Sequence, residues 1–413
     1  MRSPHPWQAR AIVLGTIAAI AFGAPRGESA TSCHGKRWVG VWATSPSDDL
    51  GVVYVDQSLR LIVNPTYGGS RLRLRLSNRF GSEPVTFGAV AVARRAAGAD
   101  VVPGSTRALR FGGQPTVTIP AGGEVVSDPR RFRFAAFEDL VVSLWVTAGG
   151  HATEHFTAIQ TSYACPPGSG DHTADDAGAA FTNTLGSWPF LTDVEIRASH
   201  RVGAVVAVGD SITDGFPGPF DGNGRYPDLL ARRLAAAGGP RIAVQNAGIS
   251  GNAVTRDIQV VFGPKLVDRL DADVIDQAGA GIAIVMEGTN DLGFPPPATA
   301  TEVIAGLQSV VDRLHLAGFR VILGTQTPSK DTTASDHGSP TAIAARNQIN
   351  DWIRTAGVAN GVVDFHAALR DPNDPDALRP EFDSGDHLHP SPAGYQAMAD
   401  AVDLSLLADP PCR

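Results

Sequence analysis

Cysteine is scarce in this chain, which has only 3 among 413 residues: Cys33, Cys165 and Cys412. Three cysteines allow at most one intrachain disulfide, so a fold held together mainly by disulfides is excluded. A bond between Cys33 and Cys412 would tie the two ends of the mature chain together, while Cys33 with Cys165, or no bond, are the alternatives. None of the three has the spacing of a catalytic or metal-binding pair.

Excess positive charge is also missing. The chain has 34 basic and 42 acidic residues and a net charge of −8. No run of basic residues stands out, so we expect no nucleic-acid partner. Arg71, Arg73 and Arg75 alternate with leucines, and we interpret them as the solvent face of a strand rather than as a phosphate-binding patch.

Long apolar runs are missing from the rest of the chain, but the first thirty residues stand apart. Arg2 and Arg10 precede an apolar stretch over 11–22, followed by small residues and a proline. This stretch is shorter than the roughly twenty residues of a membrane helix and suits the core of a signal peptide. We therefore expect residues 1–30 to be a signal peptide, with an uncleaved anchor as the alternative. The mature protein is then secreted, without a membrane span.

Two kinds of periodicity divide the remainder. Residues 34–197 contain short alternating or β-branched runs, such as 71–76, 117–119, 131–134 and 140–146, separated by turns rich in glycine and proline. Long helical periodicity is missing there, and the pattern predicts an antiparallel β-sandwich, jelly-roll-like domain. The boundary should fall near 198–203.

In residues 202–408, strand-like and helical segments alternate instead. Strands are expected around Val205, Ile242, Ile282, Val321 and Val362, and helices over 226–237, 302–317, 341–355 and 393–407. Such alternation requires right-handed crossovers and a parallel sheet covered on both faces. Five strands predict a small doubly wound α/β domain, with no internal repeat.

Ser211 is the first candidate for chemistry. The apolar run 204–208 predicts a buried parallel strand, and it ends in Gly209-Asp210-Ser211. The hydroxyl would lie at the carboxyl end of that strand, where open α/β sheets bind ligands. Ser211 is therefore a candidate nucleophile, although the same tripeptide also occurs in ordinary turns.

Asp386 and His389 supply the groups that a serine nucleophile needs. They lie within one turn of each other, just ahead of the last predicted helix, and the chain order becomes Ser, Asp, His. In the alternative interpretation, Asp386 caps the helix and His387 and His389 are solvated. A zinc site formed by these residues together with Asp383 is a further alternative, but crowding and Ser211 speak against it.

Two segments offer donors for an oxyanion hole. Residues 246–252 follow the strand at 241–245, and Gly288-Thr289-Asn290-Asp291 follows the strand at 282–286. Both place glycine or an amide side chain at the same sheet edge as Ser211, and such groups stabilise an oxyanion. For either segment alone, an ordinary polar loop after a strand is the better interpretation.

These motifs together resemble the four blocks of the SGNH, or GDSL, hydrolase family, over residues 202–408. The resemblance implies a flavodoxin-like three-layer α/β/α fold and ester hydrolysis with neither a metal nor a cofactor. It implies Ser211 as nucleophile, His389 as base and Asp386 as the group that orients His389. It also implies an oxyanion hole formed by the N–H groups of Ser211 and Gly248 and the side chain of Asn290. His387 is then a wall or surface residue.

The upstream segments 38–43 and 76–81 resemble a secreted two-domain branch of this family, in which a β domain precedes the catalytic one. We expect a secreted serine esterase that removes short acyl groups, such as acetyl groups of polysaccharides. The alternatives are a lipase or lysophospholipase for longer chains and a carbohydrate-binding protein whose hydrolase role is minor or lost. The long loops 292–300 and 328–340 either shape specificity or are inert insertions. The sequence leaves the oligomeric state open.

Overall fold

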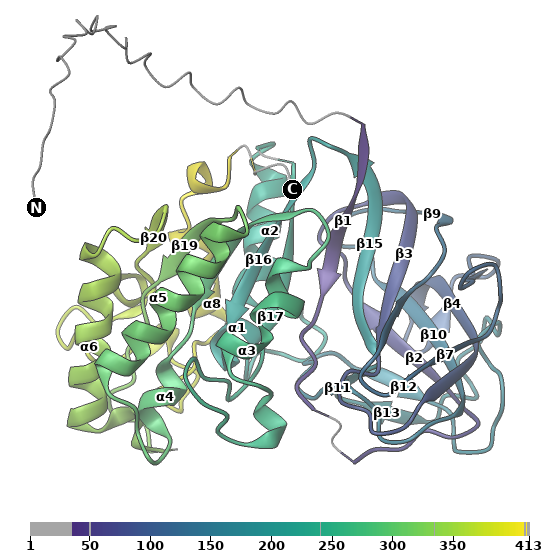
Figure 1. Ribbon diagram of the computed structural model, residues 1–413, viewed down its shortest axis with the longest axis horizontal. Helices are drawn as coiled ribbons and strands as arrows, with labels where there is room; N and C mark the ends of the chain where they lie inside the picture. Colours follow the sequence, from purple (N-terminus) through teal and green to yellow (C-terminus); the bar gives the residue numbers. More distant parts are fainter. Residues whose placement is uncertain (1–34, 49–50, 240, 334, 409, 411–413) are drawn as a thin grey trace, which may run out of the picture. The chain divides into compact units, whose positions relative to one another are not determined.

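Alternating apolar residues in the first half of the chain form antiparallel sheets in the computed structural model (Figure 1). The structure describes residues 35–48, 51–239, 241–333, 335–408 and 410. Within them, one sheet of this β-rich half (residues 36–199) contains β1 (Lys36–Ala43), β15 (Leu191–Ser199), β3 (Gly69–Ser77), β8 (Glu124–Val126) and β9 (Arg130–Phe134). The second contains β13 (Asn183–Leu185), β12 (Ser162–Ala164), β2 (Gln57–Val63), β10 (Leu140–Ala148), β4 (Val85–Ala97), β5 (Asp100–Val101), β6 (Arg107–Ala108) and β7 (Val117–Ile119). A short pair, β11 (Glu154–His155) and β14 (Trp188–Pro189), lies beside them in the described chain. The predicted antiparallel β-sandwich is confirmed.

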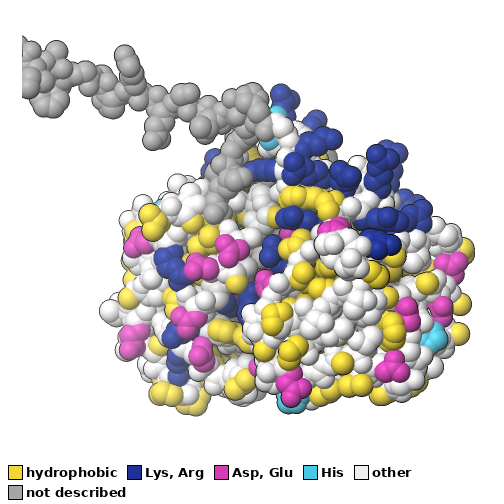
Figure 2. Space-filling model, turned by 45° about the vertical axis from the view of Figure 1, so that its right-hand side comes forward, with side chains coloured by type: hydrophobic (Ala, Val, Ile, Leu, Met, Phe, Trp, Pro, Cys, Tyr) yellow, Lys and Arg dark blue, Asp and Glu magenta, His cyan; other side chains and the backbone are white. Residues whose placement is uncertain are grey.

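Strand β3 shows why this half folds as a sandwich. Leu72, Leu74 and Leu76 are completely buried, and the arginines between them point the other way. Period-two alternation gives the strand one apolar and one polar face, as the sequence predicts. Lys and Arg side chains gather on the upper part of this half in the view of Figure 2.

The second half of the chain forms a parallel sheet. In the described residues its order is β17 (Ile242–Gly248), β16 (Gly203–Gly209), β18 (Ala280–Met286), β19 (Arg320–Gly324) and β20 (Gly361–Val363). This is the flavodoxin-like 2-1-3-4-5 order, so the predicted doubly wound α/β fold is confirmed. The helices of this α/β half are α1 (Ser211–Asp214), α2 (Tyr226–Ala236), α3 (Leu266–Leu270), α4 (Thr289–Gly293), α5 (Ala300–Leu316), α6 (Pro340–Thr355), α7 (Phe365–Leu369) and α8 (Pro392–Ala401). One-turn helices lie at Val260–Phe262, Asp336–Gly338, Pro380–Phe382 and Leu404–Leu407, and a π-helix at Asp271–Ile275.

Both faces of the parallel sheet are covered by helices. Val206 and Val208 of β16 belong to the apolar cluster that contains the buried faces of α5 and α6, whereas Val205 and Ala207 belong to the cluster with α2 and α8. Successive residues of a strand point to opposite faces, so one continuous apolar run serves both layers. This gives the three-layer α/β/α arrangement.

The last predicted helix is shorter than expected. The sequence predicts a helix over 393–407, but α8 ends at Ala401. Asp403 accepts a hydrogen bond from the N–H of Ser405 and begins a separate 3₁₀-helix, Leu404–Leu407. Aspartate favours such a cap over the interior of a helix, because its side chain competes for backbone N–H groups.

The β-rich half packs directly on the α/β half through β1 and β17. The N–H of Gly40 donates to the carbonyl of Ala278 at 2.8 Å, and the Thr66 hydroxyl lies 2.9 Å from the carbonyl of Val244. One apolar cluster runs from the β-rich half into the sheet, and Cys33–Arg413 is one compact unit. The division into domains at 34–197 and 202–408 therefore stays a prediction.

Three sequence-based expectations concern the termini and the cysteines. The predicted signal peptide, Cys33 and Cys412 lie outside the described residues. Cys165 is buried, with a free thiol. None of the helices in the described part of the chain has both the length and the hydropathy of a membrane span.

Candidate active site

Ser211 lies at the junction between β16 and α1. Asp210 caps the helix, since its carboxylate accepts a hydrogen bond from the N–H of Ile212 at 2.9 Å. The turn leaves no room for a side chain at Gly209, where a Cβ atom would lie 2.2 Å from the carbonyl oxygen of Met286. A tight strand-to-helix turn thus presents the Ser211 hydroxyl at the carboxyl edge of the sheet.

The structure brings Ser211, His389 and Asp386 together. The Ser211 Oγ lies 2.8 Å from His389 Nε2, and His389 Nδ1 lies 2.6 Å from Asp386 Oδ2. The second Asp386 oxygen accepts hydrogen bonds from the N–H groups of Leu388 and His389. Burial alone would raise the pKa of Asp386, but the hydrogen bond from the His389 side chain and these backbone donors lower it well below its usual value. Asp386 is therefore ionised and orients the imidazole.

His387 belongs to a different pair. Its Nδ1 lies 2.6 Å from Asp383 Oδ2, and its side chain is 51% exposed. The backbone of His387 has a φ of +62°, in the left-handed region. The two aspartates and two histidines are thus divided into separate pairs. The described residues contain no group of three or more potential metal ligands.

Asn290 lies in the first turn of α4, directly after β18. One proton of its amide is donated to the carbonyl of Asn252 at 2.8 Å. Its Oδ1 accepts a hydrogen bond from His337 Nε2 at 3.1 Å. The second Nδ2 proton remains for a ligand, and Asn290 lines the same pocket as Ser211 and His389.

The structure does not bring Gly248 to this pocket. Its N–H donates to Asn246 Oδ1 at 2.8 Å, and it lines a separate cavity beneath α1. The residue of the same segment that reaches the pocket is Gly251, which has a φ of +82°. Among the described residues, no acceptor pairs with the N–H groups of Ser211 and Gly251. The sequence of 246–252 could not distinguish Gly248 from Gly251 as the donor, because the course of the loop decides which N–H faces Ser211.

His337 is a site residue that sequence reasoning missed. It comes from the long loop 328–340 and packs against Gly293, where a Cβ atom would lie 2.1 Å from the ring. Burial and the nearby His389 lower the pKa of His337 to about 4, so the ring is neutral at pH 7. A neutral ring can fix the Asn290 amide without adding charge to the site. This loop therefore contributes to the site and is not an inert insertion.

The pocket itself is mainly apolar and has a volume of about 260 Å³. Rings form a continuous wall, with centroids of neighbouring rings 5.4–6.4 Å apart: Phe156, Phe262, Phe294 and His337. Phe156 and Thr157 come from the β-rich half, so both halves of the chain line the pocket. No sequence signal pointed to these two residues, because they lie in a short loop without any motif.

Two buried charged residues, Arg269 and Glu287, lie next to the same edge of the sheet. Arg269 of α3 is almost fully buried and donates hydrogen bonds to the carbonyls of Gly209 and Ala247 and to the side chain of Asn252. Its guanidinium thus joins the ends of β16 and β17 to the loop that contains Gly251. Glu287 lies 3.7 Å from this guanidinium, and burial raises its pKa well above the usual value.

Comparisons with known proteins find similarity in the α/β half of the chain. Residues 207–397 match the model of the GDSL-like Lipase/Acylhydrolase family. No curated protein sequence matches the chain significantly.

Solved structures similar to this chain include a carbohydrate acetylesterase family member from Sinorhizobium meliloti, with 16% identity over 50% of this chain and 99% of that one and a TM-score of 0.42. The aryl esterase of M. smegmatis is 16% identical over 48% of this chain and 96% of its own, with a TM-score of 0.40. A family two carbohydrate esterase from Clostridium thermocellum, solved with cellohexaose, is 14% identical over 87% of this chain and 91% of its own, with a TM-score of 0.38.

Proposed function

Because residues 207–397 match the GDSL-like Lipase/Acylhydrolase family, we propose that the chain cleaves carboxylic esters with Ser211, His389 and Asp386 as a catalytic triad. The observation that carries this proposal is the continuous hydrogen-bond path of 2.8 Å and 2.6 Å from the serine hydroxyl through the imidazole to the carboxylate. A serine hydroxyl is a weak nucleophile unless a base within hydrogen-bonding reach accepts its proton.

In the first step, Ser211 Oγ attacks the ester carbonyl and His389 Nε2 accepts the hydroxyl proton. The imidazolium that forms is stabilised by the ionised Asp386. It then protonates the alcohol oxygen as the carbon–oxygen bond of the ester breaks. An acyl-serine and a free alcohol result. In the second step, water loses a proton to His389 and attacks the acyl group. His389 then returns this proton to Ser211 Oγ as the bond between Oγ and the acyl carbon breaks, which releases the acid and restores the serine.

The negative charge that develops on the carbonyl oxygen needs donors placed in advance. We propose that these are the N–H groups of Ser211 and Gly251 and the Asn290 amide. Gly251 takes the place that the sequence suggested for Gly248, since the N–H of Gly248 is already donated to Asn246. A side chain at position 251 would collide with the ring of Phe262, at 2.3 Å, so only glycine allows this close approach.

The pocket supports short acyl groups over long lipid chains. Sites that enclose drug-sized ligands usually have volumes of about 300–1,000 Å³, and this one has about 260 Å³. An acetyl or similarly small group fits beside the phenylalanine rings, whereas a long acyl chain would extend beyond them. The resemblance of segments 38–43 and 76–81 to a secreted two-domain branch supports acetylated polysaccharide as the substrate. The apolar stretch over 11–22 supports export through a signal peptide at 1–30.

Hydrolysis of p-nitrophenyl esters from acetate to palmitate, for wild type and Ser211→Ala in parallel, tests this proposal. We expect highest kcat/KM on the shortest esters and loss of activity in the variant. A preference for palmitate would support the alternative of a lipase or lysophospholipase. Equal activity of the two proteins would refute Ser211 as the nucleophile.

A further inference from the structure

His155, in the β-rich half, has a hydrogen-bond environment that no part of the triad explains. The ring is buried, with 2% of its side chain exposed. Its Nδ1 lies 2.8 Å from the carbonyl oxygen of Ser45, and its Nε2 lies 3.1 Å from Asp214 Oδ1 and 3.2 Å from the carbonyl oxygen of Thr157. Carbonyl and carboxylate oxygens accept hydrogen bonds and do not donate them. Both ring nitrogens thus face only acceptors, which is the arrangement expected of an imidazolium.

Asp214 connects this cation to the proposed oxyanion hole. It is the last residue of α1, the helix that begins at Ser211. Its Oδ2 accepts hydrogen bonds from the Ser250 N–H at 3.1 Å and the Ser250 hydroxyl at 2.6 Å. Ser250 directly precedes Gly251, so the position of the Gly251 N–H depends on how Ser250 is held.

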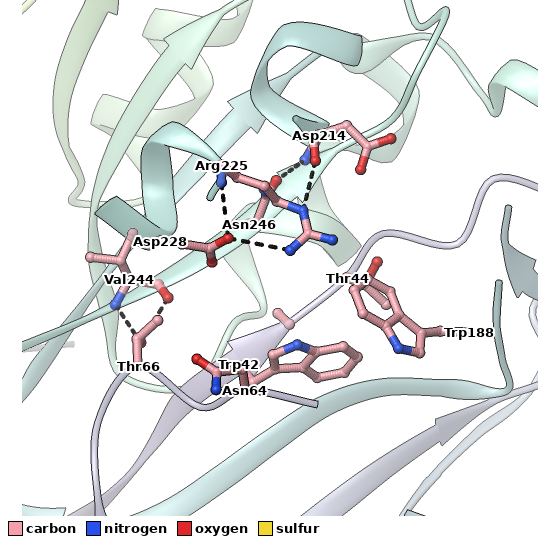
Figure 3. Close-up of a pocket in the computed structure, with 12 residues that line it drawn as sticks. Trp42, Thr44, Asn64, Thr66, Trp188, Asp214, Arg225, Asp228, Val244 and Asn246 are labelled. Carbon is pink, nitrogen blue, oxygen red and sulfur yellow. Dashed lines mark hydrogen bonds and ion pairs between the residues drawn. The ribbon is translucent and has the colours of Figure 1, made fainter. Parts of the chain in front are cut away.

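Among the charged groups around His155, Asp214 is the principal counter-ion. Figure 3 shows Arg225 between Asp214 and Asp228, with its guanidinium facing the side of Trp188. Arg225 donates to the Asp214 carbonyl at 2.8 Å and pairs with Asp228, and its charge opposes that of His155. The neighbouring Glu154 directs its carboxylate to the hydroxyl of Tyr54.

The indole of Trp188 stacks on the His155 ring, with centroids 5.6 Å apart, and shields it from solvent. The adjacent cavity, of about 20 Å³, has room for one water molecule and none for an organic ligand. A role in holding the site is therefore better supported than ligand binding. Burial alone would lower the pKa of His155, but the Asp214 carboxylate and the hydrogen bonds outweigh it and raise the pKa.

We infer that His155 is a positioning residue of the esterase: as an imidazolium it holds Asp214 and, through Asp214, the Ser250–Gly251 segment of the oxyanion hole. This inference rests on the proposed function. The β-rich half then does more than line the pocket, because it supplies the cation that keeps the catalytic loop in place. A histidine whose pKa is raised by folding stabilises this arrangement fully at pH values below its pKa in the unfolded chain. The stabilisation is lost as the pH rises through its pKa in the folded protein.

The first test measures protonation of His155 directly. Nuclear magnetic resonance of protein labelled with ¹⁵N at histidine, with His155→Phe to assign the signals, should show both ring nitrogens protonated at pH 7. This readout does not require activity, so it remains valid if the proposed reaction is wrong. A neutral His155 ring at pH 7 would overturn the inference.

The second test measures kinetics on p-nitrophenyl acetate. His155→Phe keeps the stacked ring but removes both donors, and we expect kcat to fall by about ten- to a hundredfold with little change in KM, as for a misplaced catalytic group. Wild type should also lose kcat at alkaline pH as His155 deprotonates, and His155→Phe should lack this decline.

His155→Gln, which retains a donor toward Asp214, should recover part of the lost kcat. The matched control is His172→Phe, which removes a histidine paired with Asp175 at the surface of the same half and should keep wild-type kinetics. If His155→Phe is folded but has the kcat and pH profile of wild type, the positioning role is refuted. If His155→Phe does not fold, Ser250→Ala tests the same chain of contacts, and an unchanged kcat in that variant would also refute it.

Discussion

At the scale of single residues, the site depends on which of two neighbouring histidines faces the serine. His387 and His389 each have their own aspartate at 2.6 Å, and only His389 lies within hydrogen-bonding distance of Ser211. The two residues are therefore a natural pair for testing the base, because each variant removes a histidine that is hydrogen-bonded to an aspartate.

We predict that His389→Ala lowers kcat on the order of 10⁴-fold, as expected for loss of a triad member, while His387→Ala changes it less than about twofold, since surface changes are usually small. Steady-state kinetics on p-nitrophenyl acetate, with circular dichroism to verify folding, measures both effects. Equal losses in the two variants would contradict the assignment of His389 as the base.

At the scale of elements, loops decide which donors reach the substrate. The strand ends that place Ser211 and Asn290 were predictable, since an apolar run followed by a turn marks the carboxyl edge of a parallel sheet. Gly251 and His337 were not, because their positions depend on how loops 249–263 and 328–340 fold back over that edge. His155 and Phe156 were equally hidden, since tertiary packing alone brings His155 to Asp214 and Phe156 to the pocket.

His337 allows a test at this scale. Its neutral ring holds the Asn290 amide at 3.1 Å, so His337→Phe should leave that amide held only by its hydrogen bond to the Asn252 carbonyl. We predict that kcat falls by about tenfold, less than the roughly hundredfold loss expected for Asn290→Ala. If the two residues act as a unit, the double variant should be no slower than Asn290→Ala. Additive losses on p-nitrophenyl acetate would contradict the dependence of Asn290 on His337.

At the scale of the whole molecule, one continuous core joins the two halves. Charged groups are buried at the carboxyl edge of the parallel sheet. Glu287 is the clearest example, since neither of its carboxyl oxygens has a hydrogen-bond partner in the described part of the chain. The fold class was predictable from the change of periodicity near 198–203. These buried carboxyl groups were not, because burial of an acidic residue leaves no mark on the local pattern.

The buried carboxyl group predicts how stability changes with pH. An unfolded glutamate titrates near pH 4.3, and burial raises the pKa of Glu287 in the folded protein. The folded state thus binds more protons than the unfolded state above about pH 4, so the free energy of unfolding should fall as pH rises toward the raised value. Glu287→Gln should reduce this fall between pH 5 and 8 by on the order of 1 kcal/mol, as measured by urea denaturation. The same pH dependence in both proteins would contradict the account.

Covalent labelling of the nucleophile tests the central claim most directly. A fluorophosphonate reacts with an activated serine hydroxyl, and mass spectrometry of the digested protein locates the adduct. The account predicts a single adduct on Ser211 in wild type and much slower labelling in His389→Ala. An adduct on any other serine, or Ser211 labelled equally fast in both proteins, would contradict it.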